Sequence, residues 1–345
     1  MTVKIGVIGC GRISKNHFET IKNLGNRVQL VAVCDNVEAR AKEVAESYKV
    51  PFYTNYIEML DKEKFDLVTI CTPSGMHPMM GIEVANHGVH VLTEKPMGVR
   101  LQDADALIEA CDKNNVQLFV VKQNRLNPGI QALRHAIDKG RFGRIFFINA
   151  TVFWMRPQDY YDSAKWRGTW EFDGGAFLNQ ASHYVDLVQW IGGPIDKVMA
   201  QTATLARKIE AEDTGAAVMR FRSGAIGVIQ TTMLTYPKNM EGSITVIGEN
   251  GTVKISGIAL NHVEKWEFAD YDDEDKSIFE SNYTPASVYG NGHQPYYSNV
   301  LDLLEGKQSS ATDGREGKKS LELILGIYES AKTGMAVSLP LKRTY

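Results

Sequence analysis

The first third of the chain alternates short apolar runs with amphipathic helical stretches, and this alternation constrains the fold more than any other feature. Strands and helices that alternate in this way form a parallel sheet. Its strands are buried on both faces, which explains why the runs are apolar almost throughout. The runs are Val3–Ile8, Val28–Cys34, Leu67–Ile70, Val89–Leu92 and Val116–Val121, and the helical stretches are Ile13–Leu24, Val37–Tyr48, His77–Asn86 and Leu101–Asn114.

Beyond residue 122 the pattern changes to longer segments of strand propensity. Tight turns such as Arg222–Gly224 and Gly248–Gly251 join neighbouring segments, which predicts antiparallel pairing. We therefore expect two domains: residues 1–122 with the parallel sheet, and residues 123–345 with an α+β fold on a large open, mainly antiparallel sheet. The expected strands are Ile145–Phe153, Lys197–Thr204, Ala216–Phe221, Ala225–Met233, Ser243–Ile247, Thr252–Ser256 and Val263–Phe268, and the expected helices are Ile130–Lys139, Tyr296–Glu305 and Gly314–Thr333.

The segment Ala216–Phe221 bears on assembly, because polar residues alternate only weakly along it. Such a strand is expected to be covered on both faces. Helices of the same chain would cover one face and a second copy of the chain the other. This predicts a homo-oligomer, a dimer or a tetramer, that forms through the open sheet.

The charges of the chain nearly cancel. The 38 lysines and arginines stand against 41 aspartates and glutamates, a formal net charge of −3. No overall field would therefore hold nucleic acid or an anionic membrane. No apolar run approaches the ~20 residues that cross a bilayer, and the first residues lead into a strand pattern without a leader segment. We expect a cytoplasmic protein that binds neither nucleic acid nor membrane.

The four cysteines, Cys10, Cys34, Cys71 and Cys111, form no Cys-x-x-Cys pair and lie in segments that we expect to be buried. Reduced core thiols are favoured over a disulfide or a zinc site. Neither clustered thiolates nor a His-Glu-x-x-His run offers zinc ligands, so we expect no metal.

A glycine-containing turn, Gly9–Ser14, follows the first strand and opens the first helix. Gly9 would permit a tight turn, and Gly11 would let the backbone approach a pyrophosphate at the helix N-terminus. Asp35 ends the second strand, where a carboxylate would accept hydrogen bonds from the adenosine ribose and repel a 2′-phosphate. The pattern predicts a Rossmann domain that prefers NAD to NADP; the alternative is a glycine turn and a capping aspartate without a ligand.

The segment Thr93–Met97 resembles the Glu-Lys-Pro motif of the Gfo/Idh/MocA oxidoreductases. The resemblance extends over essentially the whole chain and includes Cys71–His77, Trp166–Arg167 and Gly174–Gly175. It implies that NAD is the cofactor. The residues implied to bind it are Gly9, Gly11, Arg12, Ile13, Asp35, Thr72, Pro73, Ser74, His77, Glu94, Lys95, Gln123, Trp166 and Arg167.

Three segments, Val121–Arg125, Phe153–Tyr161 and Trp166–His183, look like those of a bacterial branch of this family. Members of that branch oxidise UDP-N-acetyl-D-glucosaminuronate (UDP-GlcNAcA) at C3. The product is a UDP-linked 3-keto sugar acid on the route to sugars of surface polysaccharide such as O-antigen. The resemblance therefore implies a UDP-sugar acid as the substrate.

Oxidation of a secondary alcohol needs a group that accepts the hydroxyl proton while hydride leaves. Asn179, His183 and Asp186 are spaced i, i+4, i+7, so a helix over Gly175–Trp190 would place them on one face. A histidine on such a face is usually a satisfied core residue, but the resemblance implies that His183 is the catalytic base. It also implies that Lys95, otherwise read as a solvated lysine, stabilises the developing alkoxide or exchanges roles with His183.

The resemblance also bears on the substrate, because a UDP-sugar acid carries a pyrophosphate and a carboxylate that call for cations or backbone amides. Many free-polyol dehydrogenases of the family carry aspartate where this chain has Asn179, and the amide avoids a second negative charge beside an acidic substrate. Some candidates would only cover the surface or pack. The candidate substrate-binding residues are Lys95, Arg125, Arg156, Tyr160, Asn179, His183, Tyr289 and His293, with Lys165 and Tyr161 also considered.

Two other functions stay open at this point. A dehydrogenase of a free sugar or inositol would need no clamp for a pyrophosphate. A non-catalytic NAD-binding regulator on the same scaffold need not keep a proton acceptor, so the presence of Lys95 and His183 argues against it.

Overall fold

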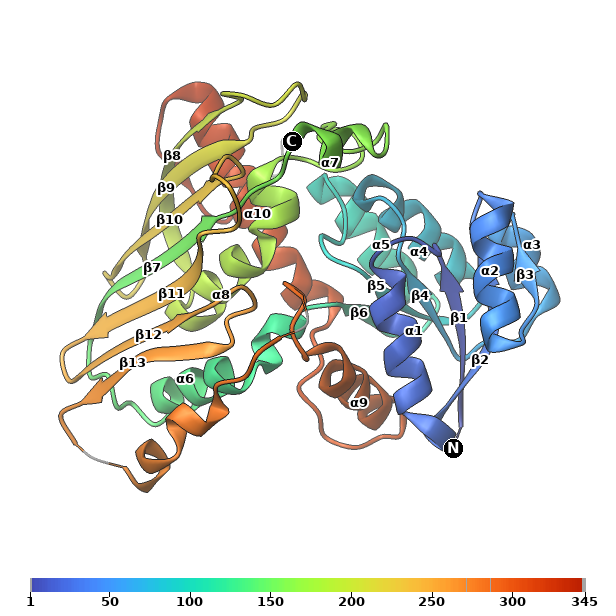
Figure 1. Cartoon of the computed structure of the whole chain (residues 1–345), viewed down its shortest axis with the longest axis horizontal. Helices are drawn as coiled ribbons and strands as arrows, with labels where there is room; N and C mark the ends of the chain where they lie inside the picture. Colours follow the sequence, from blue (N-terminus) through green and yellow to red (C-terminus); the bar gives the residue numbers. More distant parts are fainter. Residues whose placement is uncertain (1, 271, 286, 343–345) are drawn as a thin grey trace. The chain divides into compact units, whose positions relative to one another are not determined.

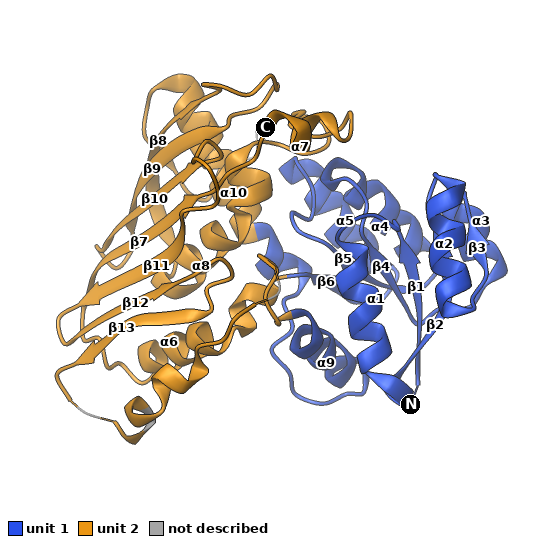
Figure 2. Ribbon diagram, in the orientation of Figure 1, with its two compact units in different colours: residues 1–121, 293–318 blue, residues 122–292, 319–345 orange. Residues whose placement is uncertain are grey.

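The computed structural model describes residues 2–270, 272–285 and 287–342, which form two compact units (Figures 1 and 2). The first unit comprises the described residues up to Val121 together with His293–Lys318. The second comprises Lys122–Gly292 and the described residues from Lys319 onward. Each unit is built on its own sheet.

The first unit contains a six-stranded parallel sheet in the order β3-β2-β1-β4-β5-β6, which confirms the predicted Rossmann fold. All four residues of β4 are buried, as expected for a strand covered on both faces. The sequence did not predict β3 and α3. The strands are β1 (Val3–Ile8), β2 (Val28–Cys34), β3 (Phe52–Tyr53), β4 (Leu67–Ile70), β5 (His90–Thr93) and β6 (Leu118–Val120), and the helices are α1 (Ser14–Asn23), α2 (Glu38–Tyr48), α3 (Tyr56–Lys62), α4 (His77–Asn86) and α5 (Leu101–Lys113).

The strand order reverses beside β1, which pairs with β2 on one side and with β4 on the other. Ligands of such sheets bind at the carboxyl ends of the strands next to this reversal. Gly9 follows β1, Asp35 follows β2 and Cys71 follows β4, while Glu94 follows β5. The predicted cofactor-binding residues of this unit therefore gather at one edge of its sheet.

Residues 293–318 belong to the first unit, whereas the sequence placed them in the second domain. Helix α9 (His293–Leu304) packs against α1. Its Tyr296 donates a hydrogen bond to the Val120 carbonyl at 2.6 Å. The Val120 amide in turn donates to the Thr312 carbonyl at 3.0 Å, so this segment covers the edge strand β6. These long-range contacts explain why the compact units differ, for this segment, from the predicted division at residue 122.

The second unit contains an eight-stranded sheet in the order β13-β12-β11-β7-β10-β9-β8-β14. Of its pairings only that of β7 with β10 is parallel, so the predicted mainly antiparallel sheet is confirmed. The strands are β7 (Ile145–Phe153), β8 (Ile195–Ala203), β9 (Thr214–Phe221), β10 (Ile226–Thr232), β11 (Glu241–Gly248), β12 (Gly251–Ser256), β13 (His262–Phe268) and β14 (Val337–Ser338), and the helices are α6 (Pro128–Asp138), α7 (Gln158–Asp162), α8 (Ser182–Gly192) and α10 (Gly314–Thr333), the last of which begins in the first unit.

The described residues of the chain cover one face of this sheet and leave the other open. Burial alternates strictly along β9, and α8 packs against β7 and β10. The other face carries apolar side chains that are exposed to solvent: Met199 is 51% exposed and Val218 is 52% exposed. The weak polar alternation of β9 thus reflects apolar residues on this open face, and its cover by a second copy of the chain stays a prediction.

Among the described residues, no helix combines the length and the apolar composition that crossing a membrane requires. The four cysteines are buried free thiols, as their apolar segments predicted. Burial raises the pKa of Cys10, Cys34 and Cys111 to about 12. These thiols are therefore protonated and weakly nucleophilic at neutral pH.

Candidate active site

The two positions in the first turn have glycine for different reasons. Gly9 has φ +98°, and a Cβ there would lie 2.7 Å from the carbonyl carbon of Cys71, so no other residue fits. A Cβ on Gly11 would meet no protein atom within 4 Å. Packing within the protein therefore does not explain Gly11, and the space beside it is where the sequence predicts a pyrophosphate at the start of α1.

The carboxylate of Asp35 is fixed by two backbone amides. Its Oδ2 accepts a hydrogen bond from Cys10 N–H at 2.9 Å, and its Oδ1 accepts one from Val37 N–H at 2.8 Å. A negative charge is thus held beside the glycine turn at the end of β2. The contact of Asp35 with the hydroxyls of an adenosine ribose stays a prediction, and a carboxylate fixed in this position is compatible with it.

His77, which was predicted to bind the cofactor, is engaged by the backbone at both ring nitrogens. Nδ1 lies 2.8 Å from the carbonyl oxygen of Pro96, and Nε2 lies 2.8 Å from that of Thr72. The imidazole is buried, and burial lowers its pKa although both carbonyls oppose this shift. His77 therefore ties the loop after β4 to the loop after β5, which carries Lys95.

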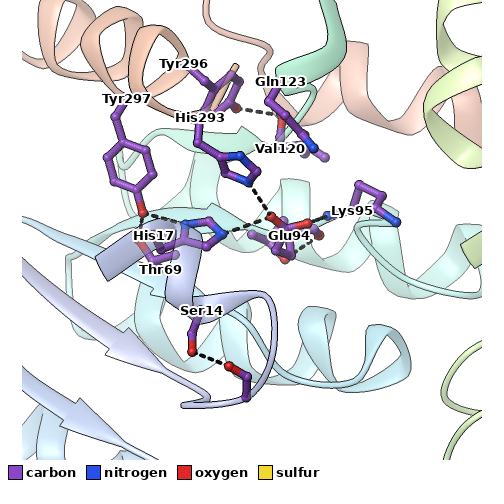
Figure 3. Close-up of polar contacts among 12 residues, drawn as sticks. Ser14, His17, Thr69, Glu94, Lys95, Val120, Gln123, His293, Tyr296 and Tyr297 are labelled. Atoms are coloured by element: carbon purple, nitrogen blue, oxygen red, sulfur yellow. Dashed lines mark hydrogen bonds and ion pairs between the residues drawn. The ribbon is translucent and has the colours of Figure 1, made fainter. Parts of the chain in front are cut away.

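A buried polar cluster lies directly beside Lys95 (Figure 3). One oxygen of the Glu94 carboxylate, Oε2, accepts the backbone N–H of Lys95 at 3.1 Å, and the other, Oε1, lies 2.9 Å from His17 Nε2. His17 Nδ1 contacts the Tyr297 hydroxyl at 2.8 Å. His293 Nε2 lies 3.6 Å from Glu94 Oε1. Glu94 and His293, predicted to bind cofactor and substrate respectively, are therefore buried partners of each other.

The charges in this cluster follow from the same contacts. Burial raises the pKa of Glu94, but the interactions with His17 and His293 outweigh burial and hold that pKa well below its usual value. Burial lowers the pKa of His17. The cluster therefore contains an ionised carboxylate and a neutral imidazole. His17, Glu94 and His293 also form a set of metal-ligand types with donor atoms within 4.8 Å of one another.

In the second unit, His183 is the second residue of α8 and is 9% exposed. Its Nε2 lies 3.1 Å from Nε2 of Gln123, which was predicted to contact the cofactor. The other amide atom of Gln123, Oε1, is buried without a hydrogen-bond partner among the described residues. A buried amide that is only partly satisfied is expected where a ligand completes the hydrogen bonding.

One turn further along α8, Asp186 lies between two buried cations. Arg125 donates to it with Nε at 2.7 Å and Nη2 at 2.8 Å, and Lys122 Nζ lies 3.5 Å away. Burial raises the pKa of Asp186, but the two cations outweigh burial and lower it. Arg125, predicted to bind substrate, therefore has its charge matched by Asp186.

Asn179 lies in a π-helical turn, Ala176–Gln180, and not in one continuous helix with His183 as predicted. Its amide nitrogen donates to the carboxylate of Asp173, whose other oxygen accepts Gly168 N–H at 2.7 Å. Asp173 therefore places a carboxylate directly beside the Asn179 amide. π-Helical turns occur frequently at functional sites.

A buried pair, Glu212 and Tyr328, caps this turn. Glu212 Oε1 accepts Phe177 N–H at 2.8 Å and the Tyr328 hydroxyl at 3.0 Å, and the Tyr328 oxygen accepts Leu178 N–H at 3.2 Å. A Cβ at Gly175 would lie 1.8 Å from Glu212 Oε2, so only glycine fits. Burial raises the pKa of Glu212 to about 7, because these hydrogen bonds only partly offset the loss of hydration.

Replacing Glu212 with glutamine is expected to remove a pH-dependent loss of stability. Because the folded-state pKa is raised from 4.5 to about 7, wild type is most stable below pH 4.5 and loses stability as the pH rises through 7. Between pH 5.5 and 8, wild type should lose about 2 kcal/mol more than Glu212→Gln, which keeps the Oε1 acceptor. Urea unfolding of both proteins at the two pH values measures this, and parallel pH profiles would contradict the assignment.

Two arginines surround Tyr160 in the second unit. Arg167 donates to the Tyr160 hydroxyl at 2.6 Å and lies 4.3 Å from its ring centre, and the Arg156 guanidinium lies 5.5 Å from the same ring. Arg156 also donates to Gln180 Oε1 at 3.1 Å. Among the described residues, no carboxylate forms an ion pair with Arg167. Such an arrangement of guanidinium groups suits an anionic ligand.

The remaining predicted residues differ in how far they are exposed. Ser74 is buried, and Arg12 and Lys165 are exposed. The half-buried ones are Ile13, Thr72, Pro73, Trp166 and Tyr289, while Tyr161 is buried and packs edge-on against Tyr160.

Sequence reasoning missed His17, Tyr297, Glu212, Tyr328 and Lys122. His17 offered a signal, since it lies on the buried stripe of α1 with Phe18 and Ile21. A polar residue on an otherwise apolar stripe needs a buried partner. Its partners lie 77 and 280 residues away in the sequence, so no local pattern could identify them.

Comparisons with known proteins agree with this arrangement. The model described as "Oxidoreductase family, NAD-binding Rossmann fold" of Gfo/Idh/MocA matches residues 3–122, and the model of the GFO/IDH/MocA C-terminal domain matches residues 130–254. Myo-inositol 2-dehydrogenase of Thermotoga maritima is 30% identical over 259 residues, 73% of this chain and 74% of that protein. D-apiose dehydrogenase of Paraburkholderia graminis is 25% identical over 365 residues, 97% of this chain and 89% of that protein.

Two solved structures resemble the whole chain. The WlbA dehydrogenase of Bordetella pertussis, in complex with NADH and UDP-GlcNAcA, is 50% identical with a TM-score of 0.96, covering 99% of both chains. The WlbA dehydrogenase of Chromobacterium violaceum, in complex with the same two ligands, is 48% identical with a TM-score of 0.94, covering 99% of this chain and 97% of that one.

Proposed function

This chain is an NAD-dependent oxidoreductase of the Gfo/Idh/MocA family, and on that basis we propose that it oxidises the C3 hydroxyl of UDP-GlcNAcA to a 3-keto sugar for bacterial surface polysaccharide. The observation that carries the proposal is its similarity, at 50% and 48% identity over 99% of the chain, to two dehydrogenases that bind NADH and UDP-GlcNAcA. Similarity at this level extends through both compact units.

The first unit fits the cofactor. The open space at Gly11 accommodates a pyrophosphate at the start of α1, and the fixed carboxylate of Asp35 accepts hydrogen bonds from ribose hydroxyls. When bound, NAD supplies the acceptor of the hydride. We assign the pyrophosphate of NAD to Gly11 and its adenosine ribose to Asp35.

In the proposed reaction, His183 takes the proton of the C3 hydroxyl, and the Lys95 ammonium stabilises the oxygen while its negative charge develops. Two observations support the role of His183: it is a buried residue at the start of α8 that keeps 9% of its surface exposed, and its Nε2 already contacts a hydrogen-bonding group, Gln123. A substrate hydroxyl would replace the Gln123 contact at that nitrogen.

The arginines around Tyr160 supply the charge that an acidic nucleotide sugar needs. The guanidinium groups of Arg156 and Arg167 both lie within 6 Å of the Tyr160 ring centre. A carboxylate or a diphosphate would accept paired hydrogen bonds from such groups. We assign them to the anionic parts of the substrate.

The choice between a nucleotide sugar and a free polyol can be measured directly, and similarity to the Thermotoga myo-inositol 2-dehydrogenase makes myo-inositol the appropriate competitor. NADH formation should be faster with UDP-GlcNAcA by about 10³-fold in kcat/KM, since each hydrogen bond to a charged group contributes about 1.5–3 kcal/mol. Equal or better turnover of myo-inositol would exclude the nucleotide sugar. Absence of NADH formation with every substrate, with NAD binding intact, would favour a regulator.

We also propose that the protein is a cytoplasmic homo-oligomer, a dimer or a tetramer, that forms through the open face of the eight-stranded sheet. The exposed side chains of Met199, Val218 and Ile247 on that sheet support this contact. Sedimentation at micromolar concentration should give at least a dimer, and Val218→Glu should yield monomers that still bind NAD. A wild-type monomer under these conditions would contradict the proposal.

A further inference from the structure

The buried cluster beside Lys95 has one arrangement of hydrogens that suits both an ionised Glu94 and a neutral His17. An ionised carboxylate only accepts hydrogen bonds, so His17 Nε2 must carry the hydrogen that it donates to Glu94 Oε1 at 2.9 Å. A neutral His17 then has a lone pair on Nδ1, which must accept the hydrogen of the Tyr297 hydroxyl at 2.8 Å. The Tyr297 oxygen, in turn, accepts the hydroxyl hydrogen of Thr69 at 2.9 Å.

This ordered series of hydrogen bonds ends at the backbone of Lys95. Glu94 Oε2 accepts the Lys95 N–H at 3.1 Å, while the Glu94 N–H donates to the Ile70 carbonyl of the neighbouring strand at 3.0 Å. The carboxylate therefore braces the point where β5 ends and the Lys95 side chain begins. Since His17 lies on α1 and Tyr297 on α9, the orientation of the carboxylate is set by two separate helices (Figure 3).

Burial of this polar cluster is costly in free energy, so packing alone does not explain it. His17 and Tyr297 are fully buried, and Glu94 is 4% exposed. A buried charge usually contributes less stability than apolar side chains of the same volume would, because desolvation offsets its attractions. The cluster does fix the orientation of its side chains, however, because each of its hydrogen bonds has a defined donor and a defined acceptor.

We propose that His17 and Tyr297 are positioning residues for Lys95: through Glu94 they hold the start of the Lys95 side chain where its ammonium meets the reacting oxygen. This inference rests on the role that the proposed function gives to Lys95. It requires that loss of the His17–Glu94 hydrogen bond lower kcat, because a small displacement of a catalytic group is enough to slow the chemical step.

Two substitutions of His17 separate its two hydrogen bonds. In His17→Gln the amide nitrogen takes the place of Nε2 and still donates to Glu94, whereas in His17→Asn the shorter side chain reaches only as far as Nδ1. We expect His17→Gln to keep kcat within about 3-fold of wild type, and His17→Asn to lower kcat about 30-fold with KM for NAD unchanged. Tyr297→Phe, which removes the donor to Nδ1, should lower kcat about 5-fold. Equal loss in the Gln and Asn variants, or a raised KM for NAD with unchanged kcat, would overturn the inference.

A background without the Lys95 ammonium distinguishes failure of this inference from failure of the proposed function. If His17 acts through Lys95, His17→Asn should have no further effect on kcat in a Lys95→Met protein. If Lys95→Met alone is as active as wild type, the proposed role of Lys95 is wrong. If Lys95→Met is slow and His17→Asn slows it by the same factor as it slows wild type, the positioning role is wrong.

The same purified proteins should be checked for thermal unfolding and for metal content. Should His17→Asn not fold, Tyr297→Phe in the Lys95→Met background retains the test, because a residue that acts through Lys95 should have no further effect on kcat there, whereas a further 5-fold loss would overturn the inference. One equivalent of zinc in wild type, lost with His17, would instead identify His17, Glu94 and His293 as ligands and overturn the hydrogen-bonded arrangement.

Discussion

Replacing His183 with alanine should lower kcat for NADH formation from UDP-GlcNAcA by about 10³-fold, because positioned general bases contribute 10²–10⁴-fold. The affinity for NAD should not change, since the predicted contacts of its pyrophosphate and its adenosine ribose, Gly11 and Asp35, belong to a different compact unit. Single-turnover NADH formation measures the chemical step, and protein fluorescence measures cofactor binding. The pH dependence should also change, with loss of the limb that reports deprotonation of the base.

The matched control for this experiment is His135→Ala, which makes the same substitution at an exposed position of α6. It should leave kcat and NAD affinity at wild-type values. If His183→Ala is as active as this control, His183 is not the base, and Lys95 becomes the candidate for proton transfer. If it instead loses NAD affinity with unchanged kcat, its role is in binding.

The sequence predicted the two sheets because their patterns are local. Continuous apolar runs such as Leu67–Ile70 are typical of strands covered on both faces, and the turn Gly248–Gly251 predicts the pairing of β11 with β12. The structure differs where a distant element decides the local backbone. The stretch Gly175–Trp190 reads as one helix, but a carboxylate from Glu212 and a hydroxyl from Tyr328 stabilise a π-helical turn at its start.

Candidate residues were predicted best where the backbone alone defines their role. The conformation of Gly9 and the place of Asp35 at the end of β2 follow from the strand-turn-helix pattern. Charged side chains were predicted less well, because their partners lie far away in the sequence. Nothing near Arg125 shows that Asp186 accepts both of its hydrogen bonds, and nothing near Glu94 indicates His17.

Asp186→Ala should have the largest effect on stability, because it leaves the Lys122 ammonium and the Arg125 guanidinium buried without their carboxylate. Removing one member of a buried ion pair costs about 3–5 kcal/mol. The lowered pKa of Asp186 means that its contribution is present above the ordinary aspartate pKa and is lost as the pH falls through the lower folded-state value. Urea unfolding at pH 7 should therefore show the full loss.

An exposed pair provides the control, since Arg315 also donates twice to one carboxylate, that of Asp112, but the two side chains are 66% and 50% exposed. Asp112→Ala should cost far less stability than Asp186→Ala, because exposed ion pairs are screened by water and contribute little. Equal losses in the two variants would mean that burial does not determine the cost at Asp186.

Replacing Lys122, Arg125 and Asp186 together with apolar residues of similar size should recover much of the stability, because no buried charge is then left unpaired.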